Sequence, residues 1–256
     1  MLRLLFMSDN KRLTLDLCLP VYNEAAILAS NVQKIVDFIQ KNDLALDCRL
    51  VILVNGSTDQ SLQIAQELSQ RWPDLVSYEN YKAASRGSAL LAYADISQAD
   101  WWGFMDIDLA VDLVSLQKFF KSMVDQPADV FLASRLMVKS SYTHKLTRKI
   151  ISVVYNQLAR FVLKTSVKDH QCGFKFISQS WWQTLRPYLQ DSRWFLDTEI
   201  VAWTTKLGGR IIEMPVDWVN NRYQVRPTKV KLVRDIINFL INLYYLRKRL
   251  RAHCSQ

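Results

Sequence analysis

The chain has 256 residues, of which 50% are hydrophobic, and a formal net charge of +9. This length is enough for one well-buried core. The four cysteines form no Cys-x-x-Cys pair, which argues against a zinc site or a disulfide framework and favours reduced thiols in a cytoplasmic protein. No run reaches the roughly 18 apolar residues that a membrane span needs, so we expect a soluble protein or one attached to a membrane surface.

Short apolar runs alternate with amphipathic helical patterns through the first half of the chain. Strands are predicted at residues 13–19, 49–54, 75–78, 101–105 and 128–133, and helices at residues 24–41, 59–71, 87–96 and 112–124. Two basic amphipathic helices follow, at residues 148–164 and 232–250. This alternation predicts an α/β fold with a mostly parallel sheet and helices on both faces. We expect a main domain over residues 1–221, which includes the helix at about 145–164, and a basic C-terminal segment over residues 222–256.

Polar loops follow three of the predicted strands. In open parallel sheets ligands bind at the carboxyl ends of the strands, so these loops are candidate site segments. Asn-Gly permits a tight turn, and Ser57 or Thr58 is expected to cap the helix that follows. The three loops are Pro20-Val21-Tyr22-Asn23-Glu24, Asn55-Gly56-Ser57-Thr58-Asp59 and Asp106-Ile107-Asp108.

Asp106 and Asp108 form the most distinctive of these loops. On a strand their side chains would share one face, because side chains alternate. Two close carboxylates repel one another unless a cation lies between them. Mg²⁺ or Mn²⁺ prefers oxygen ligands and keeps positions open for phosphate oxygens, and a metal-bound diphosphate is a better leaving group. The alternative is a solvated turn with aspartates that cap a helix.

In this order and spacing the three loops resemble those of the family 2 glycosyltransferases, which have the GT-A fold. Further segments are similar to those of the polyprenyl-phosphate sugar synthases, such as dolichyl-phosphate glucosyltransferases and mannose synthases. The resemblance runs from Leu13 to Lys229 and implies a GT-A-type α/β/α sandwich with a C-terminal amphipathic helix. These further segments are Ser85 to Leu90, Ala133-Ser134-Arg135, Asp169 to Lys175, Trp194 to Glu199 and Glu213 to Trp218.

The resemblance implies an inverting transfer of a hexose from UDP-glucose or GDP-mannose to a polyprenyl phosphate. Val54 stands where the family usually has an acidic residue that reads the nucleotide. Ala110 stands where the mannose synthases have glutamine, which favours the glucosyltransferase branch. The implied nucleotide-sugar contacts are Pro20, Tyr22, Glu24, Asn55, Arg86, Asp106 and Lys229, the implied ligands of Mg²⁺ or Mn²⁺ are Asp106 and Asp108, and the implied acceptor-phosphate contacts are Arg135 and Arg148.

The acceptor decides whether the enzyme needs a general base. A lipid phosphate is already ionised at neutral pH and can attack directly. A saccharide or other hydroxyl acceptor would need a carboxylate base, for which Asp197 and Glu199 are the candidates, unless they only decorate a helix N-terminus. His170 is a further candidate metal ligand, since some enzymes of this fold use a histidine.

The positive charge is segregated along the chain. Residues 135–168 hold eight basic residues and no acidic residue, and residues 222–251 hold nine basic residues and one acidic residue. The two basic helices can lie in an anionic membrane interface on the cytosolic side, or their apolar faces can pack on the core or on another subunit. A non-catalytic protein that binds membrane or nucleic acid is the alternative of another class. Nucleic acid is not expected, because the aromatic residues do not interleave with the cations. No feature specifies an oligomeric state.

Overall fold

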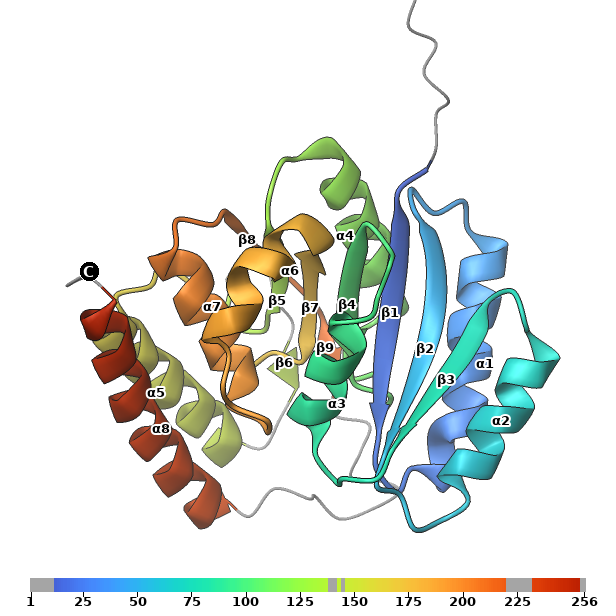
Figure 1. Cartoon of the computed structure of the whole chain (residues 1–256), viewed down its shortest axis with the longest axis horizontal. Helices are drawn as coiled ribbons and strands as arrows, with labels where there is room; N and C mark the ends of the chain where they lie inside the picture. The colour runs from blue at the N-terminus through green and yellow to red at the C-terminus, as the bar shows by residue number, and fades with distance from the viewer. Residues whose placement is uncertain (1–11, 138–141, 144–145, 220–231, 254–256) are drawn as a thin grey trace, which may run out of the picture.

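The computed structural model describes residues 12–137, 142–143, 146–219 and 232–253. A seven-stranded sheet forms its centre, in the order β3-β2-β1-β4-β7-β5-β8 (Figure 1). β7 runs antiparallel to both of its neighbours, and the other pairs are parallel. The strands are β1 (Thr14–Val21), β2 (Asp47–Asn55), β3 (Val76–Tyr81), β4 (Trp101–Met105), β5 (Val130–Ser134), β7 (Phe174–Ser178) and β8 (Ile211–Pro215), and a separate pair joins β6 (Tyr142–Thr143) to β9 (Trp218–Val219).

Helices cover both faces of the sheet, so the predicted three-layer α/β/α architecture is confirmed. One hydrophobic cluster holds α1, α2 and α4 against one face, and a second holds α3, α5, α6, α7 and α8 against the other. The helices are α1 (Ala25–Lys41), α2 (Ser61–Arg71), α3 (Arg86–Ala94), α4 (Leu113–Asp125), α5 (Leu146–Leu163), α6 (Gln179–Leu185), α7 (Leu196–Lys206) and α8 (Leu232–Ala252), with a short 3₁₀ turn at Arg186–Tyr188.

The central strands explain why the chain folds in layers. In β1, Leu15, Leu17 and Leu19 pack into the first cluster, while Cys18 packs into the second. β2 behaves in the same way, since side chains along a strand alternate between the two faces. Strands that are buried on both faces read as continuous apolar runs, and this pattern predicts β1 and β2 from the sequence. β1 and β2 run in parallel, so their carboxyl ends reach one edge of the sheet, at the bottom of Figure 1.

The alternation of strands and helices predicts nothing for residues 165–219, and there the topology changes. β7 enters the sheet between β4 and β5 in the opposite direction. Two helices then follow before β8 extends the sheet beyond β5. A single antiparallel insertion leaves no periodic signal in the sequence, because only the pairing partners define its direction.

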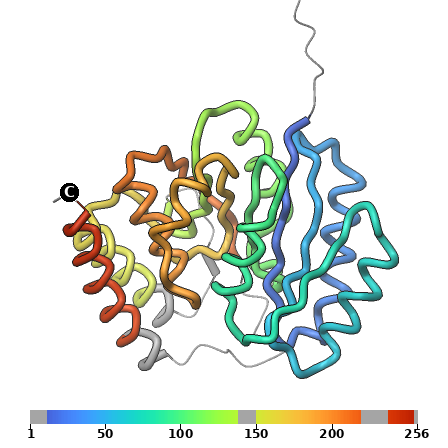
Figure 2. Tube along the Cα trace, in the orientation of Figure 1, coloured from blue at the N-terminus to red at the C-terminus, as the bar shows by residue number. Residues whose placement is uncertain are grey.

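The basic helices α5 and α8 lie side by side at one end of the molecule (Figure 2). The inner side of α8 places Leu243, Leu246 and Leu250 in the second cluster, where they pack with residues of α7. The apolar face predicted from the sequence of α8 therefore packs on the core. The predicted domain boundary at residue 221 lies outside the described residues and stays a prediction. Among the described helices, none combines the length and apolar character of a membrane span.

Candidate functional site

The loops after β1 and β2 are tied together by hydrogen bonds. The backbone N–H of Asn23 donates to Ser57 Oγ at 3.0 Å, and the N–H of Thr58 donates to Asn23 Oδ1 at 2.7 Å. The N–H of Ala25, at the start of α1, donates to Asp59 Oδ2 at 3.0 Å. The two loops therefore form one rigid edge, and Asn23 adopts a φ of 52° within it.

These contacts correct the predicted helix cap. Ser57 Oγ accepts from the first loop, and the N-cap of α2 is Gln60, whose side chain makes no capping bond. The N–H of Ser61 is satisfied instead by Asp59 Oδ1 at 3.0 Å. Ser57 therefore bonds to the loop after β1 and does not cap α2. A sequence pattern does not reveal such contacts between loops.

The implied nucleotide contacts lie on this edge. Pro20 is half-buried in β1, Tyr22 is 37% exposed just after it, and Glu24 is buried. Asn55 closes β2 at 3% exposure, and its Oδ1 has no hydrogen-bond partner among the described residues. A buried amide oxygen without a donor is costly, so a ligand that donates to it would be stabilised.

Asp106 and Asp108 lie in a turn beyond the last residue of β4, Met105. The prediction that they share one face of a strand is therefore wrong. Ile107, between them, is buried, and its carbonyl accepts from Asn31 Nδ2 of α1 at 2.9 Å. The buried isoleucine anchors the turn, and the flanking aspartates stay half-exposed. The turn presents two carboxylates at the sheet edge without the strand geometry.

A chain of buried charges leads to Asp106. Arg86, at the start of α3, donates from Nη1 to Asp197 Oδ2 at 2.8 Å. Its Nε lies 3.7 Å from Asp106 Oδ1 and has no hydrogen-bond partner among the described residues. Burial works to lower the pKa of Arg86, but Asp197 and Asp106 raise it above its ordinary value, so this buried guanidinium stays charged.

Lys175 completes this chain of charges. Its side chain is fully buried on β7, and Nζ donates to Asp197 Oδ1 at 2.8 Å and to the carbonyl oxygens of His170 and Cys172 at 3.0 and 2.6 Å. The same turn holds Gly173, where a Cβ atom would lie 2.7 Å from Asp106 Oδ2. In the sequence, Lys175 is the last residue of the family-like segment that begins at Asp169. Its signal was a lysine inside a strand that is otherwise almost wholly apolar.

Asp197 and Glu199, the candidate bases, are both buried in the first turn of α7. Both oxygens of Asp197 accept from cations, Arg86 and Lys175. Glu199 Oε2 accepts from the backbone N–H groups of Gln190 and Asp191 at 2.8 and 2.7 Å, and its Oε1 accepts from Arg249 of α8. These contacts suit residues that hold the structure together rather than bases that approach a substrate.

Arg135, an implied acceptor contact, follows β5. Its Nε and Nη2 donate to the two oxygens of fully buried Asp169 at 2.7 and 2.9 Å. Burial works to raise the pKa of Asp169, but the charge and hydrogen bonds of Arg135 outweigh it and hold the pKa below its ordinary value. Arg148 is in the first turn of α5, but its side chain lies outside the described part of the structure, as does Lys229.

The carboxylates of Asp106 and Asp108 fit a divalent cation that takes few ligands from the protein. The described residues contain no group of three or more His, Cys, Asp or Glu that could hold a metal. His170 is buried, and burial together with Lys175 lowers its pKa to about 4. Its two ring nitrogens are hydrogen-bonded to Thr165 Oγ1 and Asn156 Oδ1, so neither is open to a metal. Two aspartates suit Mg²⁺ or Mn²⁺, which commonly take few protein carboxylates together with substrate phosphates.

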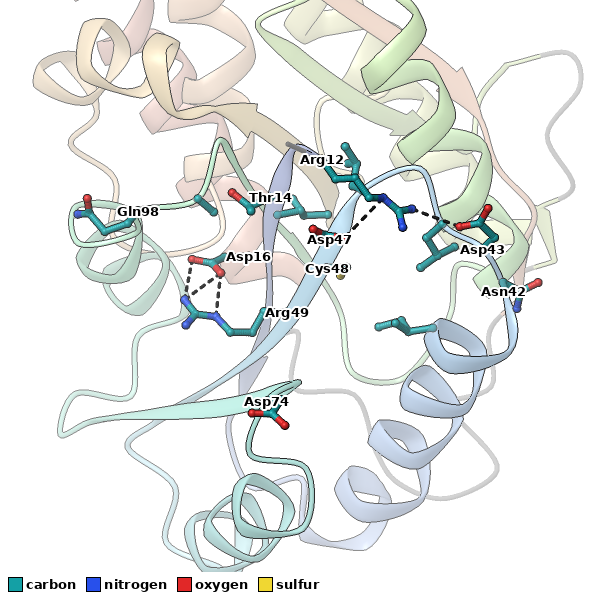
Figure 3. A pocket seen from close by; sticks show the side chains of 15 residues that line it. Arg12, Thr14, Asp16, Asn42, Asp43, Asp47, Cys48, Arg49, Asp74 and Gln98 are labelled. Carbon is teal, nitrogen blue, oxygen red and sulfur yellow. Dashed lines mark hydrogen bonds and ion pairs between the residues drawn. The ribbon is translucent and has the colours of Figure 1, made fainter. Parts of the chain in front are cut away.

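A cavity of about 570 Å³ opens at the opposite edge of the sheet. Its wall includes the amino-terminal ends of β1 and β2, and Figure 3 shows Asp16 paired with Arg49 there. Tyr93 and Ser97 also donate to Asp16, at 2.8 and 2.7 Å. The cavity therefore lies far from the strand-end carboxylates and plays no part in the candidate site.

Comparisons with known proteins agree with this architecture. The model of the family described as "Glycosyl transferase family 2" matches residues 16–186. Glycosyltransferase AglD of Haloferax volcanii is 31% identical over 219 residues, which cover 86% of this chain and 34% of AglD, so the chain spans about a third of that relative. Dolichyl-phosphate beta-glucosyltransferase of Saccharomyces cerevisiae is 24% identical over 260 residues, covering 93% of this chain and 75% of that protein.

A similar solved structure is glucosyl-3-phosphoglycerate synthase from Mycobacterium tuberculosis in complex with Mn²⁺ and UDP-glucose. It superposes with a TM-score of 0.61 at 18% sequence identity, over 90% of this chain and 79% of the other. At this identity the likeness concerns the fold alone. Since the family model covers most of the sheet and its strand-end loops, the chain belongs to glycosyl transferase family 2.

Proposed function

We propose that the chain transfers a hexose from a nucleotide sugar to a polyprenyl phosphate with inversion, using Mg²⁺ or Mn²⁺. The observation that carries the proposal is the buried guanidinium of Arg86, 3.7 Å from the Asp106 carboxylate at the end of β4. A cation and a half-exposed carboxylate held side by side suit a metal-bound diphosphate. Membership of an enzyme family disfavours the non-catalytic alternative.

UDP-glucose is the proposed donor, ahead of GDP-mannose. A curated relative is named a dolichyl-phosphate beta-glucosyltransferase, and a solved structure of similar fold holds UDP-glucose with Mn²⁺. Asn55 and the tied loops after β1 and β2 would hold the nucleoside, with Tyr22 exposed beside them. A metal held by Asp106 and Asp108 would offset the charge that develops on the leaving diphosphate. Arg86 would donate to the same oxygens.

The acceptor is proposed to be a lipid phosphate at the cytosolic face of a membrane, held by Arg135 and Arg148. One phosphate oxygen attacks the anomeric carbon while the bond from that carbon to the diphosphate breaks, which inverts the centre. No proton has to be removed, because the phosphate is already ionised. The pairing of both Asp197 oxygens with cations favours this acceptor over a hydroxyl group that needs a free base.

The test is transfer of label to lipid. The protein is incubated with Mn²⁺ or Mg²⁺, labelled UDP-glucose or GDP-mannose, and polyprenyl phosphate, and the lipid is extracted and counted. Asp108→Asn should reduce transfer by about 100-fold or more, as expected when a transition-state charge loses its counter-ion. Asp125→Asn, an exposed carboxylate on α4, is the matched control and should transfer normally.

Two results would contradict the proposal. If neither donor labels the lipid while a soluble saccharide becomes labelled, the acceptor assignment is wrong. If Asp108→Asn transfers as fast as the parent at every metal concentration, the assignment of the metal to the aspartate pair is wrong.

A further inference from the structure

The outward side of α8 carries a second apolar stripe, distinct from the one packed on the core. Its members recur at intervals of three and four residues, so they line one side of the helix. The buried residues Leu243, Leu246 and Leu250 point to the core instead. The stripe consists of Ile237, Leu240, Ile241, Tyr244 and Tyr245, which are 52%, 44%, 48%, 67% and 58% exposed.

The neighbouring helix α5 shows the same feature. Its exposed apolar residues are Ile150, Val154, Leu158 and Phe161, and Phe161 is 84% exposed. The two helices are in contact, since the rings of Tyr155 and Phe239 lie 5.3 Å apart between them. We call the exposed apolar residues of α5 and α8 together the outer face. Single exposed apolar residues are ordinary, but a set this large on two adjacent helices marks an interaction surface.

The charges beside the outer face are mainly positive. Exposed cations stand at the C-terminal ends of both helices, with Arg160 and Lys164 on or just after α5 and Lys248 and Arg251 on α8. α5 contains no acidic residue, and Asp235 is the one acidic residue in the sequence of α8. An apolar surface bordered by long cationic side chains fits a layer with apolar chains below and negative headgroups above.

We propose that the outer face docks the protein on an anionic lipid surface. The apolar residues enter the boundary between headgroups and acyl chains, and the cations contact lipid phosphates. A second copy of the chain is a poorer occupant, because both helices carry a net positive charge and two such faces would repel one another. The inference rests on the proposed function and deepens it by naming the surface that meets the acceptor's membrane. Vesicle binding tests it independently of transfer.

The experiment measures co-sedimentation of the full chain with vesicles of phosphatidylcholine alone or mixed with phosphatidylglycerol. The chain should bind the mixed vesicles, and raised salt should weaken binding. The triple variant Phe161→Ser, Tyr244→Ser, Tyr245→Ser should bind about tenfold more weakly or worse, because it loses three inserted rings. The control variant Ile96→Ser, Val114→Ser, Val124→Ser removes exposed apolar residues elsewhere and should bind like the parent.

A charge pair of variants separates attraction to headgroups from insertion. Lys248→Glu with Arg251→Glu should weaken binding to mixed vesicles by about tenfold or more. Lys118→Glu with Lys121→Glu changes the net charge equally on exposed positions of α4 and should have little effect. The proposal is overturned if the parent ignores mixed vesicles, if both members of either variant pair behave alike, or if the triple variant only turns a dimer into a monomer. Transfer to a detergent-dispersed acceptor should persist in the triple variant, so loss of docking and loss of the proposed reaction are distinguishable.

Discussion

Lys175 contacts two segments that flank Asp106 in the candidate site, namely the start of α7 and the turn that holds Gly173. Its ammonium group holds Asp197, which in turn holds Arg86 beside Asp106. It also holds the carbonyl groups of the turn whose Gly173 lies against the Asp106 carboxylate. Burying a lysine is expensive unless every donor finds an acceptor, and here three acceptors surround it.

Replacing Lys175 with Met should uncouple this arrangement. The free energy of unfolding should fall by about 3 kcal/mol, because Asp197 loses one of its two buried cations. Transfer should need more metal and donor for half-maximal rate, since Arg86 and the turn at Gly173 are no longer fixed. Steady-state titration of metal and donor, beside urea unfolding, measures both effects.

Asp16→Asn is the control for Lys175→Met. It removes a buried charge that contacts Arg49 at the opposite edge of the sheet (Figure 3). Tyr93 and Ser97 also donate to this carboxylate. It should lower stability while the metal requirement stays unchanged. Equal changes of the metal requirement in both variants would mean that Lys175 acts only through stability.

Gly173→Ala tests the space behind Asp106. The added methyl group would meet Asp106 Oδ2 at 2.7 Å, so the carboxylate must move. We expect weaker metal binding and a slower transfer, with a small change in unfolding temperature. Gly208→Ala is not a fair control because Gly208 has a φ of 81°, whereas Ala202→Gly on α7 tests a comparable one-methyl change. Unaltered metal dependence in Gly173→Ala would show that the carboxylate tolerates displacement.

At the scale of elements, ion pairs fasten segments that the sheet alone leaves apart. Arg135, after β5, binds Asp169 in the segment between α5 and β7. Glu213 of β8 accepts from the backbone N–H groups of Lys168 and Asp169 at 2.9 and 2.8 Å, which fixes the same segment. Arg135 therefore has a structural contact in addition to its proposed role toward the acceptor.

Arg135→Met should destabilise the fold by about 3 kcal/mol or more at neutral pH, because Asp169 stays buried without its cation. The folded-state pKa of Asp169 lies below its ordinary value. Its contribution is therefore complete above the unfolded pKa, near 4, and is lost as the pH falls through the folded pKa. The difference in stability between parent and variant should narrow in acid, as measured by urea unfolding across pH.

The ion pair of Arg186 with Asp95 provides a control for the predicted pH dependence of the stability difference. These side chains are 37% and 39% exposed, so Arg186→Met should change stability by no more than about 1 kcal/mol. A difference for Arg135→Met that stays constant from neutral to acid pH would contradict the assigned role of Asp169.

At the scale of the whole molecule, the three-layer core encloses the thiols. Cys18, Cys48 and Cys172 are buried and free of disulfides. Burial raises the pKa of Cys172 to about 12, although Arg135 acts to lower it, and burial also raises the pKa of Cys18 and Cys48. Thiolate is the reactive form, so these thiols should be inert in the folded protein.

A Cys254→Ser variant makes this testable, because it leaves only those three of the four cysteines. Folded protein at mildly alkaline pH should show no fast reaction with a colorimetric disulfide reagent, and urea-unfolded protein should release three equivalents. Fast reaction of one thiol in the folded protein would mean that a layer of the core opens.

The sequence by itself determined the layers and the strand-end loops. Apolar strands and amphipathic helices have their own periods, and the short loops that join them lie at one edge because parallel strands end together. The positions of Asp106, Asp108, Arg86 and Asn55 at that edge followed from this rule together with the family resemblance.

Only the tertiary structure decided the rest, because it depends on contacts between segments far apart in the chain. The antiparallel entry of β7 brings Lys175 beside Asp197, and α7 brings Asp197 to Arg86, 111 positions earlier in the sequence. α8 has apolar residues on two sides. Packing against α7 determines which side is buried and which side belongs to the outer face. Periodicity identifies an apolar side of a helix, but the neighbouring elements determine what covers it.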